Sequence, residues 1–254
     1  MIDMHNHILM DMDDGPRDEE AAIELLRQAN KENINEIIAT PHYTNKYDNS
    51  FEKVKLKIKR LCKLKEVNDL GISMYPGQEV RFHQNLIDDI KSGKVRGLNS
   101  SRYLLIEFPP NDIPDYTFGM FNELQVLGYI TIIAHPERNL ALLKDMSVLY
   151  DLVKQGALSQ LTSTSLIGHF GKGIQEVSIE LMNCKLVHFI ASDAHDIKAR
   201  PFVMKSLFED NMLLGLHGQM KKLIRNAKVV IENKEIEKYE PLVPNIQYIR
   251  DLIF

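Results

Sequence analysis

Six short, mostly apolar runs recur along the chain, and each is followed closely by residues that can bind a metal ion. The runs are residues 1–4, 37–39, 72–75, 104–106, 130–134 and 187–191, and the residues that follow them are His5 with His7, His42, Glu79, Glu107, His135, and Asp193 with His195. Short apolar runs bounded by polar residues are typical of strands buried in a sheet. The pattern therefore predicts six strands that each lead to a histidine, aspartate or glutamate.

The segments between these runs are longer, and their apolar residues recur at helical spacing. Helices are expected over residues 18–29, 49–69, 84–91, 114–127, 140–155, 173–183 and 246–254, with another after Pro201. Gly71, Gly128 and Gly156 stand where three of these helices end, a common position for glycine. Strands that alternate with helices predict βα units and a parallel sheet, and a weaker run at residues 157–162 brings the number of strands to seven.

A single domain over residues 1–254 is the simplest organisation, because no linker rich in proline, glycine or serine divides the chain. In a parallel barrel, the C-terminal ends of the strands meet on one face. Alternate residues of a strand point to the same side, so His5 with His7, and Asp193 with His195, can each reach one ion together. The strand ends, with Asp14 in the loop after the first pair, are therefore expected to form one polynuclear metal centre.

This candidate ligand set contains five histidines, two aspartates and two glutamates, which is too many for a single ion. Imidazole and carboxylate ligands without thiolate favour zinc, manganese or iron. Several ions held close together suit the transfer of a phosphoryl group to water. Two members have simpler alternatives, since His42 could be a solvated loop residue and Glu107 could belong to a buried salt bridge.

Composition excludes several classes of function. The net charge of −4 and the pI near 6.1 argue against nucleic-acid binding through bulk charge. No apolar run approaches the length of a membrane span, and residues 1–10 do not have the character of a secretory signal. Cys62 and Cys184 form no disulfide framework, which favours a reduced, cytoplasmic protein. Neither is followed six positions later by the arginine of a cysteine-based phosphatase, because Asn68 and Ile190 stand there.

Several motifs carry a resemblance to a known family. They are His5-Asn6-His7, Asp13-Asp14-Gly15-Pro16, Thr40-Pro41-His42, Ala134-His135-Pro136-Glu137-Arg138 and Ala191-Ser192-Asp193-Ala194-His195-Asp196. Together with Glu79 and Glu107 they resemble the PHP (polymerase and histidinol phosphatase) superfamily over almost the whole chain. The most similar branch is that of the manganese-dependent protein-tyrosine phosphatases of bacterial capsule and exopolysaccharide operons.

The resemblance implies a distorted (β/α)7 TIM-like barrel with three metal ions, which would be manganese or, in its place, iron or zinc. By the same resemblance, the ligands are His5, His7, Glu79 and Asp193 for the first ion, Glu79, Glu107 and His135 for the second, and Asp14, His42 and His195 for the third. Arg138 and Arg200 stand at positions that resemble the phosphate-binding arginines of this branch. A guanidinium group suits that task because its planar fork donates two hydrogen bonds to a phosphate.

The implied activity is hydrolysis of phosphotyrosine by metal-activated hydroxide attack on phosphorus. The implied partner is the phosphotyrosine-containing tail of a bacterial tyrosine kinase that regulates capsular or exopolysaccharide synthesis. We assign no general acid, because a tyrosine phenolate with a pKa near ~10 leaves more easily than an alkoxide. The alternatives are histidinol phosphatase, or another hydrolase of small phosphomonoesters, and a regulatory module that binds the kinase without catalysis.

The sequence does not assign a role to the basic stretch at Lys53–Lys65 or to His169, and it does not fix the oligomeric state. The stretch Lys53–Lys65 contains seven basic residues and is either a solvated helix face or a docking face for an acidic kinase tail or an anionic lipid. His169 stands where the resemblance leads us to expect an arginine in a Gly-x-Phe-Gly loop. The oligomeric state is undecided, and a homo-oligomer stays open.

A haloacid-dehalogenase-type nucleophile motif near Asp11 is rejected. The motif needs glycine directly after its second aspartate, whereas Asp14 intervenes before Gly15.

Overall fold

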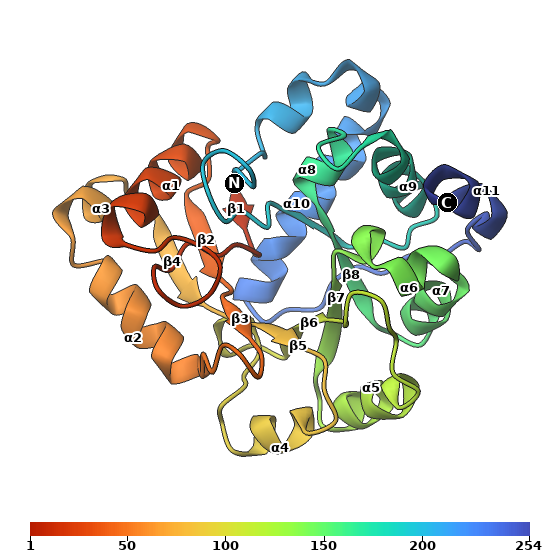
Figure 1. Ribbon diagram of the computed structural model, residues 1–254, viewed down its shortest axis with the longest axis horizontal. Helices are drawn as coiled ribbons and strands as arrows, with labels where there is room; N and C mark the ends of the chain where they lie inside the picture. Colours follow the sequence, from red (N-terminus) through yellow and green to blue (C-terminus); the bar gives the residue numbers. More distant parts are fainter.

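Parallel strands form the centre of the molecule in the computed structural model, which describes residues 1–254 (Figure 1). A three-stranded sheet has the order β1 (Ile2–Asp3), β2 (Glu36–Ala39) and β4 (Ser73–Pro76). A six-stranded sheet has the order β3 (His42–Tyr43), β5 (Glu79–Arg81), β6 (Tyr103–Glu107), β7 (Ile130–Ala134), β8 (Leu158–Thr162) and β9 (Phe189–Ala191). Every pair of neighbouring strands is parallel, as the alternation of runs and helices predicted.

The nine strands occupy seven positions around a distorted barrel, because two of the predicted strands are each broken in two. Pro41 separates β2 from β3, and Gly77 separates β4 from β5. A Cβ atom on Gly77 would lie 2.7 Å from the Leu98 side chain and 2.9 Å from that of Ile38. Any residue other than glycine would therefore require these side chains to shift. A bridge between Asn6 and Ala194 joins the first strand to the last. The predicted seven-stranded barrel is confirmed, with breaks that the apolar pattern did not indicate.

Helices surround the barrel on its outside (Figure 1). They are α1 (Glu19–Lys31), α2 (Phe51–Leu61), α3 (Lys65–Asp69), α4 (Leu86–Lys91), α5 (Thr117–Val126), α6 (Leu140–Lys144), α7 (Ser147–Lys154), α8 (Ser163–Leu166), α9 (Lys172–Asn183), α10 (His217–Ile231) and α11 (Ile246–Ile253). Short 3-10 turns are η1 (Leu98–Ser100), η2 (Pro136–Arg138), η3 (Ser206–Glu209) and η4 (Asn211–Leu216). Helix α1 shows the general pattern, since Asp18 caps its first turn and Leu25 and Leu26 face the core.

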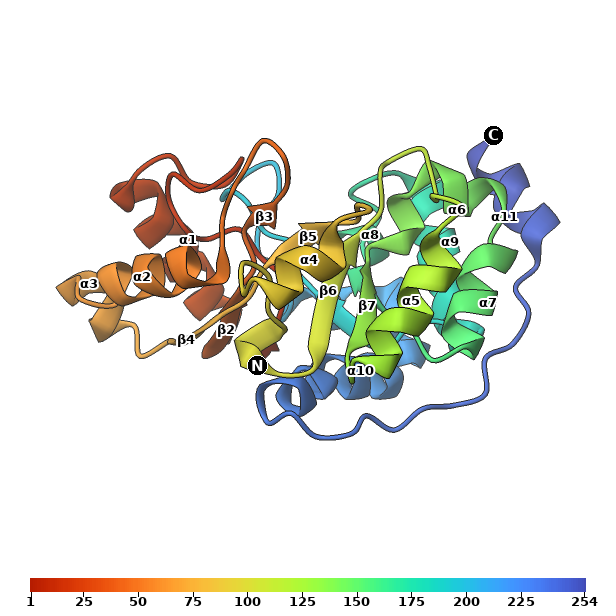
Figure 2. The same ribbon diagram turned by 90° about the horizontal axis from the view of Figure 1, so that it is seen from below.

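The hydrophobic core has two parts. A cluster of 54 buried residues lies mainly between the strands and the outer helices. A second cluster of 14 residues fills the barrel and includes Tyr103 and Phe189 from the strands and Ala227 and Val230 from α10. Helix α10 lies across the end of the barrel where the strands begin (Figure 2). The opposite end, where the strands finish, is therefore the one open to solvent.

Two predicted helices are wrong in their extent. The helix expected over residues 49–69 is divided into α2 and α3, because the chain turns after Leu61 and Leu64 starts the next helix from an extended conformation. The helix expected over residues 140–155 is divided into α6 and α7 at Asp145, whose carboxylate accepts a hydrogen bond from the Ser147 amide. At Asp145 this side-chain hydrogen bond competes with helix continuation, and neither break contains glycine or proline.

The basic stretch lies on the exposed faces of α2 and α3. Its ion pairs are Lys53 with Asp48, Lys55 with Glu52, Arg60 with Glu19, and Lys65 with Asp69. Four of its seven basic side chains therefore have an acidic partner within this protein. This arrangement favours a solvated helix face, and the docking hypothesis stays a prediction.

The chain ends on the outside of the barrel. After α10, an extended segment runs along the molecule to α11, which packs against α9 and α6 (Figure 2). Tyr103 donates a hydrogen bond of 2.6 Å to the Lys234 carbonyl oxygen and so fastens the start of this segment to the barrel. Among the helices of the structure, none has both the length and the apolar character that crossing a membrane requires.

Candidate metal centre

The nine predicted ligands lie together at the open end of the barrel. Donor atoms of three overlapping groups lie within 4.8 Å of one another, and the groups are His5, His7, Glu79 and Asp193; His7, Asp14, His42 and His195; and His42, Glu79 and Glu107. The ninth residue, His135, lies 2.8 Å from Glu79 through its Nε2 atom. Strand ends and the loops that follow them thus bring residues from across the sequence into one centre.

His5 and His7 are held so that their Nε2 atoms face the centre. The Nδ1 atom of His5 lies 2.7 Å from the Gln160 side-chain oxygen, and that of His7 lies 2.7 Å from an Asp13 carboxylate oxygen. An Nδ1 atom beside such an oxygen donates its proton outward, so the neutral form of each ring presents its Nε2 lone pair to the centre. Both Nε2 atoms lie 3.3 Å from Glu79 Oε2 and 3.4 Å from Asp193 Oδ1.

The donor set fits bound cations. Four buried ligand atoms at the centre have no hydrogen-bond partner, and they are His42 Nδ1, Glu79 Oε2, Asp193 Oδ1 and His195 Nε2. Unpartnered buried polar atoms are rare because their desolvation is costly. Metal–ligand distances of about 2.0–2.2 Å separate neighbouring ligand atoms by roughly 3 to 3.5 Å, which matches the spacing around His5 and His7.

Electrostatics at the centre keep Glu79 charged and two histidines neutral. Burial would raise the pKa of Glu79, but the neighbouring His5 and His42 outweigh burial and hold it well below its usual range. Burial, with help from the Arg138 charge, lowers the pKa of His135 to about 4. Burial likewise lowers the pKa of His195 to about 4. A neutral imidazole is the form that binds a metal ion.

The pKa of Glu107 is shifted in the opposite direction to that of Glu79. Burial, and after it the Glu79 charge, raises the pKa of Glu107 to about 7. Arg81 lies 2.7 Å from Glu107 Oε2 and compensates part of this cost. Glu107 therefore forms the salt bridge that was considered as an alternative to metal binding, with Arg81 as its partner. The same oxygen also lies 3.8 Å from His42 Nδ1 at the centre.

Asp193 connects the metal-binding groups to the two arginines. Its Oδ1 atom faces His5 and His7, whereas its Oδ2 atom accepts hydrogen bonds from Arg138 Nη2 and, at 2.9 Å, from Arg200 Nη2. Arg200 Nη1 also lies 3.4 Å from Asp14. The predicted arginines therefore converge directly beside the candidate ligands.

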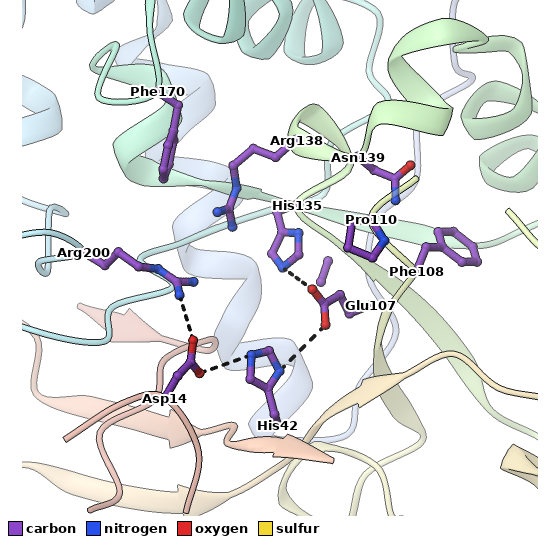
Figure 3. A pocket seen from close by; sticks show the side chains of 11 residues that line it. Asp14, His42, Glu107, Phe108, Pro110, His135, Arg138, Asn139, Phe170 and Arg200 are labelled. Carbon is purple, nitrogen blue, oxygen red and sulfur yellow. Dashed lines mark hydrogen bonds and ion pairs between the residues drawn. The ribbon is translucent and has the colours of Figure 1, made fainter. Parts of the chain in front are cut away.

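A pocket of about 410 Å³ opens onto these groups (Figure 3). It is lined by Asp14, His42, Glu107, Phe108, Pro110, Ala134, His135, Arg138, Asn139, Phe170 and Arg200. Figure 3 shows Asp14, His42, Glu107 and His135 close together, with the guanidinium groups of Arg138 and Arg200 beside them. The pocket thus combines candidate metal ligands with two arginines that can donate hydrogen bonds to an anion.

Comparison with known proteins agrees with this geometry. The family model for capsular polysaccharide synthesis, CpsB/CapC, matches residues 1–232. The chain belongs to the CpsB/CapC family. The resemblance stated from the motifs is therefore confirmed at the level of this family, and the PHP superfamily is consistent with it.

Several relatives cover nearly the whole chain. A putative tyrosine-protein phosphatase, CapC of Staphylococcus aureus, is 49% identical over 242 residues, or 95% of each chain. The tyrosine-protein phosphatase YwqE of Bacillus subtilis is 40% identical, also over 95% of each chain. A solved structure from work on YwqE and on CpsB of Streptococcus pneumoniae, described as unique metal-dependent tyrosine phosphatases, superposes with a TM-score of 0.90 and 39% identity over 96% of this chain and 99% of that one.

A more distant structural match supports the barrel alone. An amidohydrolase from Mycoplasma synoviae superposes with a TM-score of 0.54 at 11% identity, over 98% of this chain and 91% of that one.

The grouping of ligands differs in detail from the grouping that the resemblance implied. His42 joins Glu79 and Glu107 as well as Asp14 and His195, and His7 belongs to two groups. His135 lies close to Glu79 but 4.0 Å from Glu107. Glu79 begins β5 instead of following the end of β4, because Gly77 breaks the strand before it.

Four residues that support the ligands were not predicted, and they are Asp3, Asp13, Gln160 and Glu137. Two of them contact ligands directly, since Asp13 binds the His7 side chain and the His42 amide, and Gln160 binds the His5 side chain. The other two hold nearby loops, since Asp3 accepts hydrogen bonds from the Ser192 amide and hydroxyl, and Glu137 accepts them from the Thr162 amide and the Ser165 hydroxyl. The Asp13-Asp14-Gly15 motif was the signal for the first of them. A Cβ atom on Gly15 would lie 2.2 Å from the His7 carbonyl oxygen, so this turn needs glycine.

Two candidate ligands have unusual backbone conformations. His135 has φ of 32° and Asp193 has φ of 54°, both in the left-handed region that L-residues rarely adopt. Both follow the last residues of a strand, where the chain must turn to present the side chain to the pocket. Conformations of this kind are concentrated at functional sites, since packing around them must compensate the strain.

Proposed function

We propose that this protein is a metal-dependent protein-tyrosine phosphatase. Its substrate would be phosphotyrosine on a bacterial tyrosine kinase that regulates capsular or exopolysaccharide synthesis. The observation that carries the proposal is the convergence of unpartnered ligand atoms and two arginines in one pocket. The names of the relatives, all tyrosine phosphatases, favour this activity over histidinol phosphatase.

Three manganese ions are the proposed cofactor, with iron or zinc as substitutes. The proposed ligands are His5, His7, Asp14, His42, Glu79, Glu107, His135, Asp193 and His195, which offer nitrogen and oxygen donors without thiolate. When bound, such ions activate water for attack on phosphorus and neutralise charge on the phosphate oxygens. The buried, ionised Glu79 lies among four histidines and is the carboxylate that would be shared between ions.

Arg138 and Arg200 are the proposed phosphate-binding residues. Both line the pocket, and both donate to the same oxygen of Asp193, so their free N–H groups lie next to one another. A phosphate ester entering the pocket would accept hydrogen bonds from these guanidinium groups. The tyrosine phenolate would then leave without a dedicated proton donor, because its pKa of about 10 makes it a good leaving group.

The protein would act as one domain in the cytoplasm. Residues 1–254 would act as a single catalytic domain, and the family model already spans residues 1–232. The two unpaired cysteines, Cys62 and Cys184, support a reducing, cytoplasmic environment. The partner would be the phosphotyrosine-containing tail of the kinase, which the metal centre receives at the open end of the barrel.

Substrate preference tests the proposal. Manganese-loaded protein should hydrolyse a phosphotyrosine peptide with a kcat/KM at least about 100-fold above that for histidinol phosphate, because the aryl leaving group departs more easily. Initial rates of phosphate release with both substrates measure this ratio. A preference for histidinol phosphate would retain the metal site and refute the tyrosine-phosphatase proposal. Turnover of neither substrate would favour the non-catalytic regulatory module.

A further inference from the structure

Phe170 is a pocket residue that core packing does not explain. It lines the pocket together with the ligands and the arginines (Figure 3), but it belongs to neither hydrophobic cluster and is not packed against one. Phe108, the other phenylalanine of the pocket, is buried in a ring cluster with Phe82 and Phe121. Phe170 is only half-buried, and its ring contacts are with Arg138 and His169.

The Phe170 ring lies over the guanidinium group of Arg138. The distance from the Arg138 Cζ atom to the ring centre is 4.8 Å, which is within the range of a cation–π interaction. Figure 3 shows Phe170 and Arg138 side by side, with Phe108 and Pro110 on the far side of His135. An aromatic surface is thus placed directly beside a candidate phosphate-binding group.

The loop that carries Phe170 is held in a defined conformation. Gly168 and Gly171 have φ values of 77° and 93°, which glycine adopts without strain. The His169 amide donates to the Thr164 carbonyl oxygen, and the Gly171 amide donates to that of Gly168. The first bond joins the loop to α8, which directly follows β8, and the second closes a turn within the loop.

The same anchor fixes the loop relative to Arg138. Glu137, the neighbour of Arg138 in the chain, accepts hydrogen bonds from the Thr162 amide at 3.0 Å and the Ser165 hydroxyl at 2.7 Å. Arg138 itself donates to the Thr162 hydroxyl at 3.3 Å. The aromatic ring and the guanidinium group therefore keep their relative position before any substrate enters.

The low pKa of the phenolate favours aryl over alkyl phosphates in the chemical step, but it does not bind the phenyl ring, so a contact with the ring needs a residue of the pocket. We propose that Phe170 is the specificity-determining residue that packs against the phenyl ring of phosphotyrosine while Arg138 binds its phosphate. This inference rests on the proposed phosphatase function and adds the feature of the pocket that selects aryl over alkyl phosphates. An alternative is that Phe170 only positions Arg138.

The experiment compares two inhibitors of manganese-loaded protein. Phe170→Leu retains apolar volume but removes the ring, and stacking of two rings contributes about tenfold to an affinity. The inhibition constant of benzylphosphonate should therefore rise about tenfold, together with a similar loss of kcat/KM for a phosphotyrosine peptide. The inhibition constant of inorganic phosphate should not change. Phe118→Leu, a half-buried phenylalanine of α5 that does not line the pocket, is the matched control.

Two other patterns of inhibition would overturn the inference. An equal rise for benzylphosphonate and inorganic phosphate would mean that Phe170 only positions Arg138. No change for either would mean that the ring does not contact the substrate. Failure of the unmodified protein to hydrolyse the peptide would refute the proposed function, whereas the two inhibition constants, measured with any aryl phosphate that is turned over, would still report on Phe170.

Discussion

Replacing Asp193 with asparagine will lower kcat/KM for a phosphotyrosine peptide by about 1,000-fold, the upper end of the loss expected from one electrostatic group at a reaction centre. The reason is that one Asp193 oxygen faces the imidazoles of His5 and His7 and the other holds Arg138 and Arg200. Asparagine has the same shape but no charge. Because it has only one side-chain oxygen, it cannot face the imidazoles and accept hydrogen bonds from the arginines at the same time. Steady-state kinetics with the metal-loaded variant measure the loss.

The control for this variant is Asp151→Asn, which removes one exposed carboxylate on α7. It should retain full activity, and circular dichroism of both variants should match that of the unmodified protein. Activity of Asp193→Asn within about tenfold of the unmodified protein would contradict the account, because no group in the pocket could replace a lost metal ligand at so small a cost. Bound metal, measured in the same samples, separates loss of an ion from loss of arginine positioning.

Replacing Arg138 with lysine will lower kcat/KM for the same peptide by about 100-fold. Lysine keeps the positive charge but lacks the planar fork, so it cannot donate to Asp193 and to a phosphate oxygen together. It also removes the guanidinium group beneath Phe170. Kinetics over a range of peptide concentrations will show whether the loss lies in KM, in kcat or in both.

Arg225→Lys, an exposed substitution on α10 at the closed end of the barrel, serves as the matched control. It makes the same chemical change far from the pocket and should leave both kinetic constants unchanged. If Arg138→Lys behaved like this control, Arg138 would have a structural role and phosphate binding would rest on Arg200 alone.

The metal centre was largely predictable because its residues follow strands that the apolar runs reveal. His135 follows Ile130–Ala134, and His195 follows Phe189–Ala191, so parallel pairing brings both to one end of the barrel. Asp14 lies at no strand end, and only its place in the loop after His5 and His7 and the later resemblance pointed to it. The exposure of this end follows from α10, which closes the other one.

Supporting residues were not predictable, because their roles arise only when distant segments meet. Gln160 orients His5 across 155 positions of sequence, and nothing near either residue indicates the contact. That the strands resume as β3 after Pro41 and as β5 after Gly77 was not predictable for a related reason. Each strand segment contains only two to four residues, too few for a pattern to show where one ends and the next begins.

Titration of metal-free protein with Mn²⁺ is the most direct test of the central claim, that the ligands form a polynuclear centre for phosphotyrosine hydrolysis. Protein stripped with a chelator should release no phosphate from a phosphotyrosine peptide. Addition of Mn²⁺ should restore turnover, and metal analysis after removal of free ions should find about three ions per chain, as several ions close together suit phosphoryl transfer. Full turnover by the stripped protein, or no turnover at any Mn²⁺, Fe²⁺ or Zn²⁺ concentration, would contradict the account.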